Sequence, residues 1–128
     1  MYDHIEIPVA DLDRARLFYN AALTPLGIVC DVDIPHTPPE ERGLLGYYGE
    51  TGPAFSLLGG GPVIGCVQLV FAAPDCAAVA AFRLAGLAAG GSEASHGSGL
   101  PVVGTPLCRA ALFDPDGHRI EAVCAAVP

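Results

Sequence analysis

The chain contains no lysine and no tryptophan, and six arginines are its only strongly basic side chains. Without lysine, Schiff-base chemistry and a phosphate-binding loop of the Walker type are excluded. Fourteen acidic residues give a formal net charge of −8 at pH 7. Binding to nucleic acid is therefore not expected, because a phosphate backbone requires a basic protein surface.

Long hydrophobic runs are missing as well, although 52% of the residues are hydrophobic. No stretch approaches the roughly 18 apolar residues of a membrane helix, so no membrane partner is expected. The first residues lack the basic region of a secretory leader. Five cysteines without paired spacing predict free thiols and a cytoplasmic setting rather than a disulfide framework. The high apolar content of a chain of 128 residues favours a single domain, residues 1–128, that forms a homodimer.

What the sequence does contain is an internal repeat. At an offset of 64 residues the pairs are Asp11 and Asp75, Phe18 and Phe82, Leu23 and Leu87, and Gly27 and Gly91. At an offset of 65 the pairs are Gly52 and Gly117, Phe55 and Ile120, and Leu58 and Val123. A long repeat that occurs only twice predicts one domain built from two similar modules, residues 1–61 and 65–128.

Each module reads as a strand, a helix and three further strands. In the first module, alternation predicts a strand over 4–9, a helix from Asp11 or Asp13 to about Leu26, and strands near 28–34, 43–49 and 54–58. In the second, the corresponding elements are a strand over 66–71, a helix over 75–90, and strands near 91–95, 106–113 and 118–124. The order predicts an α+β fold.

Three segments, His4–Tyr19, Ala21–Gly27 and Asp114–Val123, resemble the vicinal oxygen chelate superfamily. This superfamily contains glyoxalase I, extradiol dioxygenases, fosfomycin resistance enzymes and bleomycin-sequestering proteins. The resemblance implies two β-α-β-β-β modules whose eight strands form a curved, cup-like mixed sheet with the helices outside. It does not select an activity, because the fold hosts several chemistries and some pure binding proteins.

The resemblance also implies a set of metal ligands. The repeat pairs His4 with Gln68 and Ser56 with Glu121, and relatives that use a metal bind it at these positions. His4, Gln68 and Glu121 are thus the candidate ligands of a Ni, Zn, Mn or Fe ion, with Glu121 also the candidate catalytic residue. Ser56 is a poor substitute for the glutamate of glyoxalase I, and Gln68 stands where histidine is usual. The alternative is that His4 hydrogen-bonds Glu121 without a metal.

Further residues are expected near the same site. Glu6 and Arg119 lie two residues from candidate ligands and share their strand faces, and Arg109 could hold a substrate carboxylate or pair with an acidic neighbour. These three are the candidate substrate-binding residues. Cys66 and Cys108 are weak candidates for a nucleophile.

Two expectations concern burial. His118 lies beside a turn and is expected at the surface, and Glu121 is expected to face a wet cup outside the core. Replacing Glu121 by alanine is therefore predicted to abolish metal uptake and leave the fold intact.

The sequence leaves three functions open. The first is a glyoxalase-like or dioxygenase-like metal-dependent enzyme, a lyase, isomerase or dioxygenase, that acts on a small molecule with vicinal oxygens. The second is a metal-free protein of the bleomycin resistance type that binds a drug or antibiotic, with an acidic surface that steers a cation inward. The third is a degenerate relative that has lost both activities.

Overall fold

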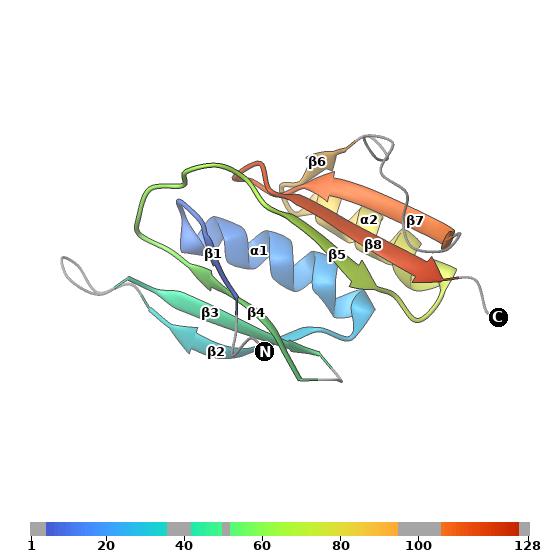
Figure 1. The fold of residues 1–128 in the computed structure, drawn as a ribbon, viewed down its shortest axis with the longest axis horizontal. Coiled ribbons are helices and arrows are strands. Elements are labelled where there is room, and N and C mark those ends of the chain that lie inside the picture. Colours follow the sequence, from blue (N-terminus) through green and yellow to red (C-terminus); the bar gives the residue numbers. More distant parts are fainter. Residues whose placement is uncertain (1–4, 36–41, 50–51, 95–105, 126–128) are drawn as a thin grey trace.

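The computed structural model of the protein describes residues 5–35, 42–49, 52–94 and 106–125. The first module contains β1 (Glu6–Pro8), α1 (Leu12–Leu23), the 3-10 helix η1 (Thr24–Leu26), β2 (Val29–Ile34), β3 (Leu44–Gly49) and β4 (Gly52–Leu58). The second contains β5 (Gln68–Ala72), α2 (Cys76–Ala88), β6 (Ser92–Glu93), β7 (Pro106–Phe113) and β8 (Arg119–Ala125). The predicted order of elements is confirmed (Figure 1).

The two modules have the same sheet topology. The strand orders are β1-β4-β3-β2 and β5-β8-β7-β6, and in each sheet the first strand runs parallel to the last. The predicted α+β fold of two modules is confirmed. Its strands divide into two four-stranded mixed sheets, because each first strand pairs with the last strand of its own module. Figure 1 shows α1 crossing the molecule between the sheets and α2 lying behind β7 and β8.

The two helices begin with repeat-related N-cap residues and contact each other. Asp11 and Asp75 are the N-caps of α1 and α2, and each carboxylate accepts a backbone N–H three residues later, at 3.1 Å and 2.8 Å. The helices, predicted to lie outside the sheet, also contact each other. A Cβ at Gly86 of α2 would clash with the Leu112 side chain of β7 and would lie 3.3 Å from the Phe18 ring and 3.4 Å from Ala22, so the bare glycine makes room for β7 as well as for α1.

A shared aromatic cluster joins the modules. Tyr47 stacks on Phe55 at a ring-centroid distance of 5.2 Å, and Tyr19 of α1 lies edge-on to Phe55 at 5.6 Å. Phe71 of β5 contacts Phe55 of β4 at 5.6 Å. The repeat-related pair Phe18 and Phe82 is completely buried. One continuous core therefore spans both modules.

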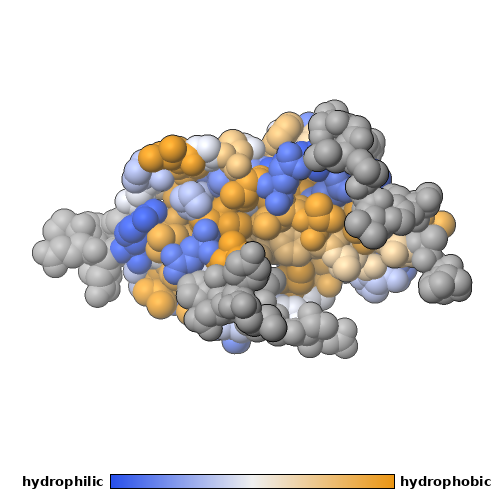
Figure 2. Space-filling view, viewed as in Figure 1, coloured by the Kyte–Doolittle hydropathy of each residue, from blue (hydrophilic) through white to orange (hydrophobic). Residues whose placement is uncertain are grey.

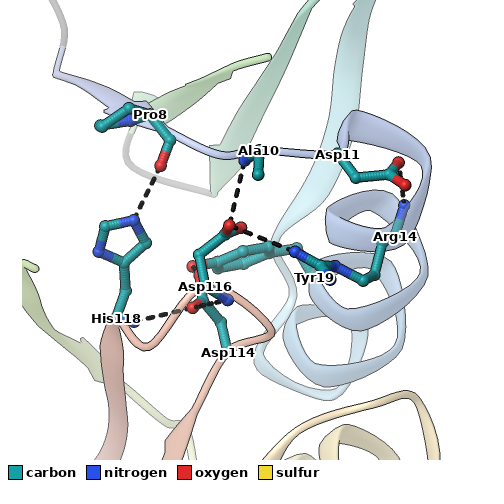
Figure 3. A network of polar contacts seen from close by, with 8 residues as sticks. All are labelled: Pro8, Ala10, Asp11, Arg14, Tyr19, Asp114, Asp116 and His118. Carbon is teal, nitrogen blue, oxygen red and sulfur yellow. Dashed lines mark hydrogen bonds and ion pairs between the residues drawn. The ribbon is translucent and has the colours of Figure 1, made fainter. Parts of the chain in front are cut away.

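The turn between β7 and β8 docks onto the first module (Figure 3). Asp114, 4% exposed, accepts the Tyr19 hydroxyl proton at 2.5 Å and the backbone N–H groups of Asp116 and His118 at 2.9 Å and 2.8 Å. Asp116 in turn accepts the Ala10 N–H at 3.1 Å. A buried carboxylate with three donors holds the turn and α1 together.

His118 links the edge strands of the two sheets. Its Nδ1 accepts the Val67 N–H at 3.1 Å, so the ring proton lies on Nε2 and is donated to the Pro8 carbonyl at 2.8 Å. The side chain is completely buried. The expectation that His118 lies at the surface is therefore wrong, because the turn folds back against β1 and does not project into solvent.

Buried tyrosines predict a loss of stability in alkali. Burial, followed by the negative charge of Asp114, raises the pKa of Tyr19 far above its ordinary value, and burial also raises the pKa of Tyr47. The unfolded chain loses these protons near pH 10. The stabilisation is thus complete below about pH 10 and decreases as the pH rises further, by up to about 1.4 kcal/mol per pH unit for each tyrosine.

Urea denaturation between pH 8 and pH 11 measures this decrease. Tyr19→Phe should unfold more easily at pH 8, because it loses the bond to Asp114, and should show a shallower decline toward pH 11. An equal decline in wild type and Tyr19→Phe would show that Tyr19 is not responsible.

Candidate functional site

Charged side chains gather on one face of the second sheet. Gln68 of β5 lies opposite Arg119 of β8, Glu121 lies opposite Ala111 of β7, and Arg109 of β7 lies opposite Val123 of β8. Paired and alternate residues of a sheet point to the same side. Gln68, Arg109, Arg119 and Glu121 therefore share one face, which we call the open face. Ile120, Ala122 and Leu112, on the other face, are buried in the core.

Glu121 is the centre of this charged group. Its Oε1 accepts a hydrogen bond from Nη1 of Arg119 at 2.8 Å and lies 3.5 Å from Nη2 of Arg109. Only 2% of Glu121 is exposed. The expectation that this residue is exposed to water is therefore wrong, although it lies on the face of the sheet opposite the core. Its ion pairs with two guanidinium groups compensate the carboxylate for the loss of water.

The guanidinium group of Arg109 has N–H donors without a partner among the described residues. Its one ion pair among the described residues is the long contact to Glu121, and its Nε is buried without a hydrogen-bond partner there. The side chain is 26% exposed, so part of it remains accessible to solvent. A buried N–H without a partner costs free energy unless a ligand or water accepts it. The sequence left two roles open for Arg109, pairing with an acidic neighbour and binding a substrate carboxylate. The first is present, and the N–H groups that remain could still bind such a carboxylate.

The other predicted site residues lie on both sheets and in the segment that leads into β5. Glu6 lies opposite Ser56 on the first sheet, exposed to solvent. Gln68 is also exposed and has Arg119, not Glu121, as its neighbour across the strands. Cys66 is an exposed free thiol. His4 lies outside the described residues. The described candidates that come together are thus Arg109, Arg119 and Glu121, with Gln68 at their side.

Sequence reasoning also missed a disulfide. Cys76 is bonded to Cys108, so the prediction that all thiols are free is wrong, and Cys108 is not available as a nucleophile in this state. The two positions are separated by 32 residues, and no local pattern pairs them. The fold brings the first residue of α2 over β7.

Comparison with known proteins identifies the fold and the family. No family model and no curated protein matches the sequence. Among solved structures, a glyoxalase/bleomycin resistance protein from Albidiferax ferrireducens is 30% identical over 98% of this chain and 99% of its own, with a TM-score of 0.72. The chain belongs to the glyoxalase/bleomycin resistance family of the vicinal oxygen chelate superfamily.

More distant members share the fold alone. A glyoxylase/bleomycin resistance protein/dioxygenase domain from Frankia sp. is 18% identical over 98% of each chain, with a TM-score of 0.66. A fosfomycin resistance protein, FosX, from Listeria monocytogenes is 12% identical over 99% of this chain and 93% of its own, with a TM-score of 0.68. That structure holds Mn(II) and 1S,2S-dihydroxypropylphosphonic acid. No helix in the described part of this chain is long and apolar enough to cross a membrane.

The residues of the open face fit a divalent metal ion poorly. One carboxylate and two guanidinium groups leave the cluster of Arg109, Arg119 and Glu121 with a net charge of +1. Two unit charges about 4 Å apart interact by about 4 kcal/mol at an effective dielectric constant of 20, and this interaction is repulsive between a metal cation and each arginine. Gln68 offers only a neutral carboxamide oxygen. The described donor set therefore suits an anion better than a cation.

Proposed function

We propose that the open face binds a small organic anion with neighbouring oxygens and that it does so without a metal ion. Arg109 is the residue that pairs with the carboxylate or phosphonate group of this ligand. The observation that carries the proposal is the guanidinium group of Arg109, which has, among the described residues, no partner for its buried Nε and one long ion pair.

Glu121 and Arg119 complete the arrangement. The 2.8 Å bond between them fixes the carboxylate, and the carboxylate in turn lies 3.5 Å from Nη2 of Arg109. The planar fork of an arginine binds a carboxylate or phosphonate through two parallel hydrogen bonds. Because the whole chain carries a charge of −8, this local excess of positive charge is needed to attract an anion.

Apolar side chains flank the charged cluster and suit the carbon skeleton of such a ligand. Val70 of β5 lies opposite Glu121 and is 56% exposed, and Phe113 of β7 lies opposite Arg119 and is 37% exposed. Figure 2 shows hydrophobic surface across the middle of the molecule, with hydrophilic residues in patches beside it. Pockets that bind small molecules combine mostly apolar walls with a few oriented polar groups.

Calorimetric titration of oxalate, a small dianion with adjacent oxygens, into protein kept in a chelator tests the proposal. Arg109→Gln is expected to weaken binding by about ten-fold to a hundred-fold, because a hydrogen bond to a charged group contributes about 1.5–3 kcal/mol. Arg83→Gln is the matched control, since Arg83 is also paired with a glutamate but lies on the surface of α2. Equal affinities of wild type and Arg109→Gln would contradict the proposal.

A metal-dependent lyase, isomerase or dioxygenase is the second candidate. It is supported by the Mn(II) found in the FosX structure and by the placement of Gln68 and Glu121 on one face. Titrating Mn²⁺ alone into metal-free protein separates the two. Our proposal predicts no stoichiometric uptake of Mn²⁺, whereas the second candidate requires uptake of about one ion per chain.

We further propose that residues 1–128 act as one domain and that two chains associate. Large apolar side chains that are not part of the proposed anion site are exposed on the second module, among them Leu84 of α2 and Leu107 of β7. Exposed apolar surface of this kind is commonly covered by a subunit interface. Light scattering should give the mass of a dimer, and a monomer mass at high protein concentration would contradict this part.

A further inference from the structure

Three cysteines from three different elements converge on the side of the second sheet that faces α2. Cys76 is the first residue of α2, Cys108 lies on β7 and Cys124 on β8. Their Sγ atoms all lie within 4.8 Å of one another. Cys76 and Cys108 form the disulfide, and Cys124 is a free thiol with 7% exposure.

The pairing of β7 with β8 places two of the three cysteines side by side. Cys108 and Cys124 are directly opposite in the β7–β8 ladder, and the next pair on the same face is Ala110 and Ala122. Both alanines are buried. The sulfur atoms therefore lie beside an apolar layer, away from the charged residues of the open face. Among the described residues, no other group of three cysteine, histidine or acidic side chains is placed to hold an ion.

We propose that Cys76, Cys108 and Cys124 form a Cu(I) site in the reduced protein, and that the Cys76–Cys108 disulfide is its closed, metal-free state. A dithiol reductant opens the site: two electrons and two protons pass from the dithiol to the disulfide, which yields two cysteine thiols and a cyclic disulfide of the reductant. Each thiol that then binds the ion loses its proton to the buffer. A reducing compartment would keep the thiols reduced.

The ligand set selects a soft ion of low coordination number. Cu(I) is a soft ion that thiolate ligands favour. Zn(II) in structural sites takes four protein ligands, and the cluster provides three. The position of Cys76 at the start of α2 contributes as well, because the N-terminal end of a helix stabilises a nearby thiolate.

This site is independent of the proposed anion-binding function. The three sulfur atoms lie on the face of β7 and β8 opposite to Arg109 and Glu121, since Cys108 and Cys124 are at even positions of the strands and the charged residues at odd ones. Oxidation state is expected to control metal uptake, because the two cysteines that form the disulfide are also two of the three ligands.

The test is an anaerobic Cu(I) titration in competition with bathocuproine disulfonate, whose copper complex is coloured. Wild-type protein is reduced with a phosphine, which is then removed, and is compared with the oxidised form. The reduced protein should withdraw about one Cu(I) per chain from the chelator, and the oxidised protein none. Alkylation followed by mass spectrometry should count three free thiols in the oxidised form and five in the reduced form, since five cysteines include one disulfide.

Cysteine variants test whether these three sulfur atoms, and not the other thiols of the chain, bind Cu(I). Cys124→Ser leaves the disulfide pair intact and should weaken Cu(I) binding by more than about tenfold, since even changes outside the ligand set of a metal site cost about 10- to 100-fold. Cys30→Ser and Cys66→Ser are matched controls, because both are free thiols outside the cluster, and should bind as wild type does. Circular dichroism verifies that each variant is folded, and Cys108→Ser provides a second ligand deletion if Cys124→Ser does not fold. Equal Cu(I) affinity of the ligand variants and wild type, or uptake of Zn(II) without Cu(I), would overturn the assignment.

Discussion

Asp114→Ala should lower the free energy of unfolding by about 3–5 kcal/mol. The carboxylate is buried and accepts three hydrogen bonds, one from Tyr19 and two from backbone N–H groups of the turn that follows it. Each hydrogen bond to a charged group contributes about 1.5–3 kcal/mol, and donors that stay buried without a partner add a further cost. A domain of this size has a total stability of about 5–15 kcal/mol, so this substitution removes a large part of it.

Urea denaturation at pH 7 measures the effect. Asp31→Ala is the matched control, because Asp31 is exposed, and its stability should lie within about 0.5 kcal/mol of wild type. Tyr19→Phe removes one of the three donors and should cost less than Asp114→Ala. The two substitutions should not be additive, because they delete the same bond. An Asp114→Ala protein as stable as wild type would show that the turn is not held by this carboxylate.

The second large effect is expected for Glu121→Ala, which should destabilise the protein by about 2–4 kcal/mol. Removing one partner of a buried ion pair leaves the opposite charge without compensation, which typically costs about 3–5 kcal/mol. Arg119 and Arg109 are 15% and 26% exposed, so water recovers part of this cost. The two guanidinium groups would also repel each other once the carboxylate between them is gone.

Glu93→Ala is a suitable comparison for this substitution. Glu93 pairs with Arg83 at 2.7 Å, but both side chains are about half exposed, and exposed ion pairs contribute about 1 kcal/mol or less. Glu121→Gln keeps an oxygen that can accept the Arg119 hydrogen bond and should retain part of the lost stability. If Glu121→Ala and Glu93→Ala unfold at the same urea concentration as wild type, the arginine pair does not depend on Glu121.

Most of the fold could be predicted because its determinants are local or repeated. Local sequence predicted helix starts at Asp11 or Asp13 and at Asp75, and the structure has Asp11 and Asp75 as the two N-caps. Alternation of apolar residues predicted one buried side for the first strand and its flanks: Ile7 and Val9 are completely buried, whereas Ile5 is 41% exposed. The offset of the repeat then assigned the same order of elements to both halves.

The contacts between modules could not be read from the sequence. The Tyr19–Asp114 bond joins residues 95 apart, and the His118–Pro8 bond joins residues 110 apart. Each depends on how the β7–β8 turn folds back onto the first sheet, and the turn composition alone says only that the chain reverses. The same holds for the Cys76–Cys108 disulfide, which depends on the packing of α2 against β7.

The candidate site residues could be named from the sequence, but which of them contact one another could not. Strand parity predicted that Arg119 and Glu121 share a face. It could not show that Glu121 is buried and paired with both Arg109 and Arg119, because that depends on the side-chain conformations. This arrangement changes the favoured ligand of the open face from a metal ion to an anion.

The most direct test of that conclusion is a crystal structure of the protein grown in the presence of both Mn²⁺ and oxalate. Our account predicts oxalate within about 3 Å of the Arg109 guanidinium nitrogens, with the Arg119–Glu121 bond intact and no Mn²⁺ on Glu121. A Mn²⁺ ion coordinated by Gln68 and Glu121, with Arg109 and Arg119 turned away from the carboxylate, would contradict it.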